Sequence, residues 1–149
     1  MQIGVIGAGT CDEATAGKAE RVGRLFAGRG AVLVCGGLGG VMEAAARGAR
    51  AEGGIAVGIL PGSDPNAGNP HLSVRIATGF GHGRNLLIPQ SCRGVIAIAG
   101  GYGTLSEIAF ARKIGIPVVG IATWPLDGSF PVVDDPDEAV ELLFRRLGR

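Results

Sequence analysis

Four glycine-rich segments, each following a strand-like run, constrain the fold of this chain more than any other feature of its sequence. They are Gly7-Ala8-Gly9-Thr10, Gly36-Gly37-Leu38-Gly39-Gly40, Gly79-Phe80-Gly81-His82-Gly83 and Gly100-Gly101-Tyr102-Gly103-Thr104. Runs such as 31–35 and 95–99 are apolar throughout, which is typical of parallel strands buried on both faces. Glycine lets the backbone turn sharply where such a strand ends. The pattern therefore predicts parallel strands that end in glycine turns.

Amphipathic segments separate these runs, as in 12–29, where Ala19, Val22 and Phe26 recur at helical spacing. We expect strands at Gln2–Gly7, Ala31–Cys35, Ile55–Leu60, Val74–Ala77, Val95–Ala99 and Pro117–Ala122. We expect helices at Asp12–Arg29, Gly40–Glu52, Gly83–Ser91, Thr104–Lys113 and Asp135–Leu147, with Pro89 ending its helix early. Alternating strands and helices predict a single α/β domain over residues 1–149, with a doubly wound, Rossmann-like parallel sheet and helices on both faces.

The composition argues against several classes of protein. The formal net charge is +1 and neither sign of charge dominates, so the overall charge gives no argument for nucleic acid or for a membrane as a partner. No apolar segment approaches the ~20 residues of a membrane span, and we expect no signal peptide. The three cysteines are an odd number without metal-ligand spacing, which predicts reduced thiols, no metal site and a cytoplasmic protein.

In a doubly wound sheet, ligands bind beyond the carboxyl ends of the strands, so the glycine turns should share one crevice. The free N–H groups of such turns and of the helix starts after them suit a phosphate. We expect the ligand-binding residues to be Gly7, Gly9, Gly36, Gly37, Gly39, Gly40, Gly100, Gly101, Tyr102, Gly103 and Thr104. For the turn at 36–40, close packing of helix against sheet explains the glycines equally well.

Two charged residues accompany these turns. Arg84 stands at a predicted helix start, where a cation opposes the helix dipole, and its planar guanidinium suits a phosphate or carboxylate. A surface arginine paired with a nearby acid is an equal alternative. Glu107 lies one helical turn beyond the last glycine turn. However, Thr104 and Glu107 also form a capping box, and the local sequence favours this role over catalysis. We expect His82 to be an exposed loop histidine.

The common nucleotide motifs are incomplete. Gly7-x-Gly9 is half of a dinucleotide fingerprint, but its third position is Asp12, which we interpret as a helix N-cap. The second strand ends in Cys35 and two glycines, without an acid for a ribose hydroxyl. There is no Gly-Lys-Ser/Thr sequence of the P-loop type.

Together, the motifs resemble the LOG family, the cytokinin-nucleotide phosphoribohydrolases often misnamed lysine decarboxylases. Gly100-Gly101-Tyr102-Gly103-Thr104-x-x-Glu107 is similar to the family signature, and Gly36-Gly37-x-Gly39-Gly40-Val41-Met42 to its earlier glycine turn. Arg84 stands where the family carries an arginine. The resemblance runs from the N-terminus to about residue 122. Ala99 replaces the proline that opens the signature, and Asn85 replaces the lysine that follows the arginine.

This resemblance implies hydrolysis of the N-glycosidic bond of a nucleoside 5′-monophosphate to free base and ribose 5-phosphate, with no cofactor required. It implies no decarboxylation of lysine. Arg84 and Glu107 would be the catalytic residues. Glu107 would stabilise positive charge on the ribose or activate water, as in glycoside cleavage, and Arg84 would orient the substrate or help the base leave.

The chain is shorter than typical LOG enzymes and is similar to a short bacterial subgroup that resembles molybdenum cofactor carrier proteins. In that alternative the pocket holds the phosphate of a pterin, the molybdenum cofactor, without turnover. A nucleotide sensor is a third possibility. The superfamily also includes the fold of DNA-processing protein A, but this chain lacks a basic patch for that role. In every case we expect a phosphorylated small-molecule ligand and a homo-oligomer, a dimer or larger, in which the alanine-rich helices at 40–52 and 104–113 pack against a partner subunit.

Overall fold

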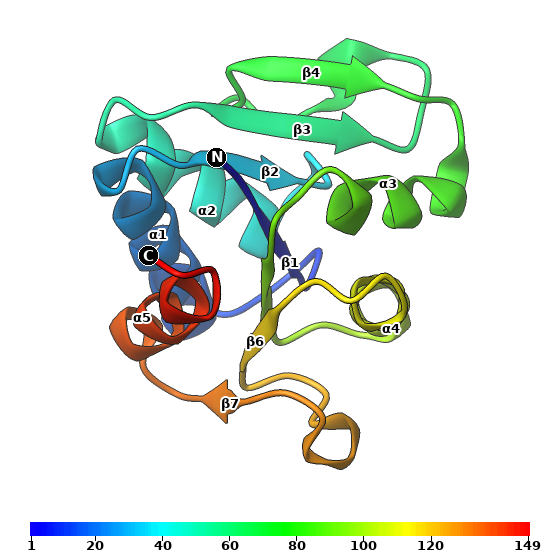
Figure 1. Cartoon of the computed structure of the whole chain (residues 1–149). Helices are drawn as coiled ribbons and strands as arrows, with labels where there is room; N and C mark the ends of the chain where they lie inside the picture. Colours follow the sequence, from blue (N-terminus) through cyan, green and yellow to red (C-terminus); the bar gives the residue numbers. More distant parts are fainter.

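The computed structural model describes all 149 residues, and its seven strands form one sheet (Figure 1). The strands are β1 (Gln2–Gly7), β2 (Val32–Cys35), β3 (Ala56–Leu60), β4 (Val74–Ala77), β5 (Val95–Ile98), β6 (Val118–Ile121) and β7 (Val132–Val133). The helices are α1 (Glu13–Gly28), α2 (Val41–Ala51), α3 (Arg84–Gln90), α4 (Tyr102–Lys113) and α5 (Pro136–Arg146), with short 3₁₀ helices at Pro65–Ala67, Gly81–Gly83 and Leu126–Gly128. Each predicted strand and helix is present. The short edge strand β7 was not predicted, because two residues are too few to show a periodic pattern.

The strand order is β4-β3-β2-β1-β5-β6-β7, and every neighbouring pair is parallel. The chain winds outward from β1 to β4, returns to the centre and then winds the other way from β5. The predicted doubly wound sheet is therefore confirmed. The switch point lies between β1 and β5, where Ile6 is opposite Ala97 and Gly7 is opposite Ile98. Connections diverge there, and this leaves an open crevice at the carboxyl ends of the strands.

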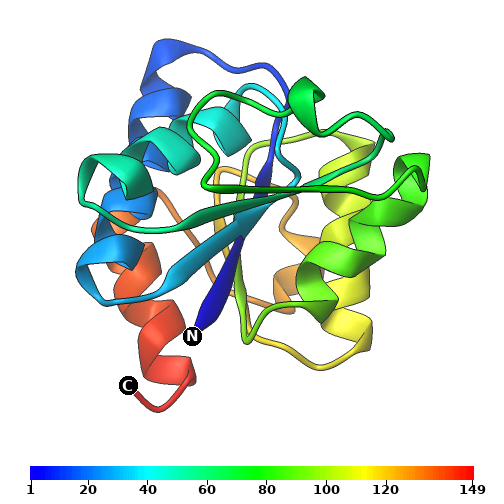
Figure 2. The same cartoon turned by 90° about the horizontal axis from the view of Figure 1, so that it is seen from above.

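Helices cover both faces of the sheet, as predicted (Figures 1 and 2). α1, α2 and α5 lie on one face, and α3 and α4 lie on the other. The first face buries a core cluster of 24 residues and the second one of 11, so most of the apolar core lies under α1, α2 and α5. No helix is both long and apolar enough to cross a membrane.

Glycines allow α1 and α2 to pack with their backbones in contact. A Cβ at Gly23 would collide with the carbonyl of Ala45, and one at Gly48 with the carbonyl of Glu20. Four of the five alanines of α2, Ala44, Ala45, Ala46 and Ala49, are buried in this contact and against the sheet. The expectation that the alanine-rich face of this helix meets a partner subunit is therefore wrong, because the chain itself covers that face. The homo-oligomer itself stays a prediction.

Side chains mark the helix ends where the sequence indicated them. Asp12 caps α1 by accepting a hydrogen bond from the Thr15 N–H at 2.8 Å, as expected. Asp135 does the same for α5 from the Glu138 N–H, also at 2.8 Å. Pro89 lies inside α3, which continues to Gln90, so the helix does not end at the proline as expected.

Candidate functional site

A cavity of about 310 Å³ lies at the switch point of the sheet. Its walls are formed by Gly7, Ala8, Gly9, Leu38, Met42, His82, Arg84, Asn85, Gly101, Gly103, Thr104 and Glu107. All four glycine-rich segments contribute at least one of these residues. The prediction that the turns share one crevice is therefore confirmed.

Backbone N–H groups around this cavity have no partner in the fold. The amides of Gly9, Leu38, Gly39 and Gly103 donate no backbone hydrogen bond. The first bond of α4 runs from the Leu105 N–H to the Gly101 carbonyl at 3.0 Å, which leaves the preceding amides of that turn free. Free amides at converging turns form a binding surface for an anion.

Five predicted ligand-binding glycines do not line the cavity: Gly100 and the four glycines of the turn at 36–40, which are Gly36, Gly37, Gly39 and Gly40. A Cβ at Gly36 would collide with the guanidinium of Arg84, and one at Gly40 with the carbonyl of Ala8. Gly37 has φ +78° and packs beside Leu60 and Gly58 of β3. Packing therefore accounts for glycine at 36, 37 and 40. Of the turn at 36–40, only Leu38 lines the cavity.

Arg84 is a buried cation without a partner. Its side chain is 7% exposed, its Nε has no hydrogen-bond acceptor, and its guanidinium forms no ion pair within 4.0 Å. Burial lowers the pKa of Arg84, and the neighbouring Glu107 opposes this effect. The alternative of a surface arginine is wrong, because α3 directs the side chain into the cavity. A buried charge of this kind is costly unless an anion compensates it.

The predicted capping box of α4 is wrong. The helix begins at Tyr102, two residues earlier than expected, with Gly101 as its N-cap and no side-chain cap. Thr104 is therefore the third residue of the helix, where it packs against Gly100. Glu107 lies one turn further along and has no role at the helix end. The cause is Gly101, whose extended backbone (φ −105°, ψ −146°) starts the helix before the threonine.

Glu107 is instead a buried acid in the cavity wall, only 6% exposed. Burial raises the pKa of its carboxyl to about 8, although the positive charge of Arg84 partly opposes this. Glu107 and Arg84 come no closer than the 4.0 Å limit of an ion pair. At neutral pH the site therefore combines a cation with a largely protonated acid, so that Glu107 does not repel an incoming anion.

The segment that follows β6 supports the turn between β5 and α4 through two hydrogen bonds. Thr123 donates from its hydroxyl to the Ala99 carbonyl at 2.7 Å, and Trp124 donates from Nε1 to the Gly101 carbonyl at 3.0 Å. Ala99 has φ +50°, which the ring of a proline cannot adopt. The replacement of the family's proline by Ala99 thus accompanies a left-handed turn. Tyr102 is 82% exposed, lies against the ring of Trp124 and does not line the cavity.

Several residues of the cavity wall were not predicted as site residues. Asn85 is buried and donates from Nδ2 to the Ser106 hydroxyl at 3.1 Å, which ties α3 to α4. Leu38 and Met42 carry no sequence signal beyond their place in the glycine motif. His82 is exposed, as expected, and also borders the cavity. The buried Cys35 thiol is no nucleophile, because burial raises its pKa to about 12.

This arrangement defines a Rossmann-like α/β protein with a cationic cavity at the switch point of its sheet. A sequence model of the SLOG cluster4 family matches residues 1–141, and the chain belongs to that family. The resemblance to the LOG-like group seen in the glycine motifs is therefore confirmed.

Relatives cover nearly the whole chain. An uncharacterized protein of Archaeoglobus fulgidus is 50% identical over 140 residues, which are 94% of this chain and 92% of that protein. The molybdenum cofactor binding protein of Rippkaea orientalis has a similar structure, with a TM-score of 0.92, 32% identity and coverage of 98% of this chain and 96% of that one. The molybdenum cofactor carrier protein of Chlamydomonas reinhardtii has a TM-score of 0.88 at 30% identity, with 99% and 98% coverage.

Proposed function

We propose that this protein binds the molybdenum cofactor, a pterin that carries a phosphate, and holds it without turnover. The observation that carries the proposal is the buried guanidinium of Arg84, which has no partner in the fold and lies beside free backbone amides. The similarity to one protein that binds this cofactor and to another that carries it supports this choice of ligand.

The residues of the cavity fit such a cargo. Arg84 supplies the positive charge for the phosphate, and the free amides of the turns supply neutral donors. The hydroxyl of Thr104, in the first turn of α4, is a further group for a phosphate oxygen. The protonated carboxyl of Glu107 can both donate to and accept from the polar edge of a pterin ring. A cavity of about 310 Å³ is at the small end of ligand pockets, enough for part of this ligand rather than for all of it.

A second candidate is the hydrolysis of a nucleoside 5′-monophosphate to free base and ribose 5-phosphate. The observation that favours it is the pKa of Glu107, which at about 8 suits a general acid that protonates a leaving base. The same protonation removes the negative charge with which Glu107 was expected to stabilise the ribose. We therefore place the carrier first.

Two parallel assays distinguish the carrier from the hydrolase. The protein is mixed without oxygen with cofactor released from a molybdoenzyme and then passed through a desalting column. Molybdenum and the fluorescence of the oxidised pterin are measured in the protein fraction. We expect about one equivalent per chain for the wild type and little for Arg84→Met, with the exposed Arg112→Met as the matched control.

In parallel, the wild type and Glu107→Gln are incubated with the common nucleoside 5′-monophosphates, and free base is measured by chromatography. Base release that requires Glu107, without retention of the cofactor, would replace the carrier by the hydrolase. Neither retention nor release would refute both functions.

A further inference from the structure

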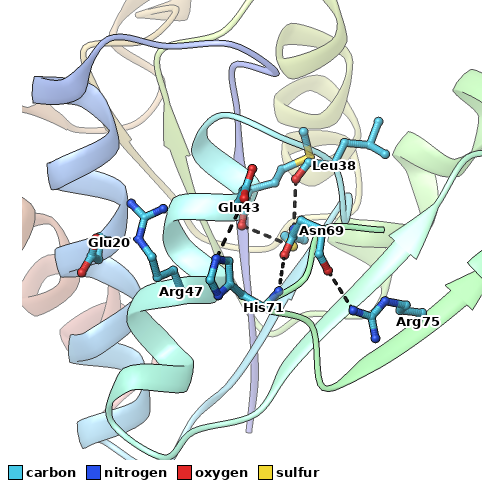
Figure 3. Close-up of polar contacts among 9 residues, drawn as sticks. Glu20, Leu38, Glu43, Arg47, Asn69, His71 and Arg75 are labelled. Atoms are coloured by element: carbon cyan, nitrogen blue, oxygen red, sulfur yellow. Dashed lines mark hydrogen bonds and ion pairs between the residues drawn. The ribbon is translucent and has the colours of Figure 1, made fainter. Parts of the chain in front are cut away.

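The loop between β3 and β4 contributes a buried asparagine that lies behind the glycine turn at 36–40. Asn69 is 7% exposed and follows the 3₁₀ helix Pro65–Ala67 closely. It does not line the cavity. Figure 3 shows its side chain facing Leu38 of the glycine turn, with His71 and Arg75 on either side.

Asn69 binds two successive carbonyl groups of this turn. Its backbone N–H donates to the Gly37 carbonyl at 2.9 Å, and its side-chain Nδ2 donates to the Leu38 carbonyl at 3.0 Å. One residue from a different connection of the sheet thus fixes both peptide groups that follow the positive-φ glycine at position 37.

The remaining contacts of Asn69 fix its own orientation. Its Oδ1 accepts from the His71 N–H at 3.0 Å, and its carbonyl accepts from Arg75 Nη2 at 2.9 Å (Figure 3). Because Nδ2 must donate and Oδ1 must accept, only one orientation of the side-chain amide satisfies both partners. The asparagine is therefore a rigid support.

This support determines the direction of the free amides in the turn. In a planar trans peptide group, the N–H points opposite to the C=O. When Asn69 holds the carbonyls of Gly37 and Leu38, the N–H groups of Leu38 and Gly39 point away from Asn69. These two amides donate no backbone hydrogen bond, and Leu38 lines the cavity.

We infer that Asn69 is a positioning residue for the phosphate of the ligand, which it never touches. It holds the turn at 36–40 in its binding conformation before the ligand arrives, so that binding does not have to order this segment. The inference rests on the proposed binding of a phosphorylated ligand. It adds a residue of the β3–β4 loop that controls phosphate binding, although this residue lies outside the glycine motifs and the cavity wall.

The test uses Asn69→Ala, with Asn66→Ala as the matched control. Asn66 lies in the same loop, is exposed, and its side chain makes no hydrogen bond. Hydrogen–deuterium exchange of the ligand-free proteins reports the order of this turn through the N–H groups at positions 41 and 69, which donate to the carbonyls of Ala8 and Gly37, both at 2.9 Å. We expect at least tenfold faster exchange there for Asn69→Ala, with the centre of the sheet unchanged and the control equal to the wild type. Asn69→Asp retains the acceptor for His71 but loses the donor to Leu38. It should show the same local change, which keeps the test decisive if the alanine variant folds poorly.

Titrations with inorganic phosphate and with 6-hydroxymethylpterin, which has no phosphate, separate positioning from general damage. We expect Asn69→Ala to bind phosphate about tenfold more weakly and the pterin unchanged. Equal exchange of the amides at positions 41 and 69 in all variants, or an equal loss for both probes, would overturn the role of Asn69. If the wild type bound neither probe, the proposed function would fail. The exchange experiment would still decide whether Asn69 orders the turn.

Discussion

The buried carboxyl of Glu107 predicts how the stability of this protein changes with pH. Its pKa is about 8 in the folded protein and 4.5 in its ordinary state. Between these values the folded protein keeps a proton that the unfolded chain releases, so the folded state binds more protons. The free energy of unfolding must therefore fall as the pH rises through this window. Glu107→Gln keeps the shape of the protonated acid and removes its titration.

The size of the effect follows from the two pKa values. Their difference of about 3.5 corresponds to about 5 kcal/mol, at 1.36 kcal/mol for each pKa unit. The range from pH 5.0 to pH 8.5 leaves out the outer parts of both titrations. Within it, the free energy of unfolding changes by about 4 kcal/mol because of Glu107. The buried thiols of Cys35 and Cys92 stay protonated in this range, because their pKa values are about 12.

The assay is urea unfolding of the wild type and of Glu107→Gln at pH 5.0 and 8.5, with Glu13→Gln, at an exposed position, as the control. We expect the wild type to lose about 4 kcal/mol more than Glu107→Gln between the two pH values. The control should follow the wild type. If the wild type and Glu107→Gln lose the same amount, the carboxyl is ionised in the folded protein, and the argument for a neutral acid beside the anion site fails.

Two further predictions concern the guanidinium and the contact between α1 and α2. Arg84→Met should raise the free energy of unfolding by about 1–3 kcal/mol, because it replaces an unpaired buried charge with an apolar side chain. It should also weaken phosphate binding at least tenfold, and a loss of stability in thermal unfolding would contradict the assignment of a charge without a partner. Gly23→Ala should destabilise the fold by about 1–3 kcal/mol, because the added methyl group collides with the backbone of α2. Gly17→Ala on the same helix meets open space and should stabilise by up to about 1 kcal/mol, so equal effects of the two substitutions would refute the packing argument.

Much of the fold could be predicted because its signals are local. The apolar run before Gly100 and the helical spacing of Ala19, Val22 and Phe26 depend only on neighbours in the chain. The same is true of Asp12, whose cap on α1 needs a partner three residues away. The edge strand β7 carries no such signal, since only its pairing with β6 identifies it.

The site was predictable in its position and less so in its chemistry. The glycine turns indicated the crevice, and Arg84 and Glu107 were named as site residues from the motifs. The neighbouring sequence could not decide the role of Glu107, because Thr104 and Glu107 also have the spacing of a capping box. The helix starts earlier because Gly101 takes an extended conformation, in a turn that Trp124 holds from another part of the chain.

The sequence by itself determined the order of strands and helices, the doubly wound class and the crevice shared by the glycine turns. These follow from periodicity and from where a backbone without a Cβ can bend. Only the tertiary structure decided that Glu107 is a neutral acid, that Arg84 is a cation without a partner and that Asn69 supports the glycine turn. Each of these properties depends on burial and on contacts between segments far apart in the chain.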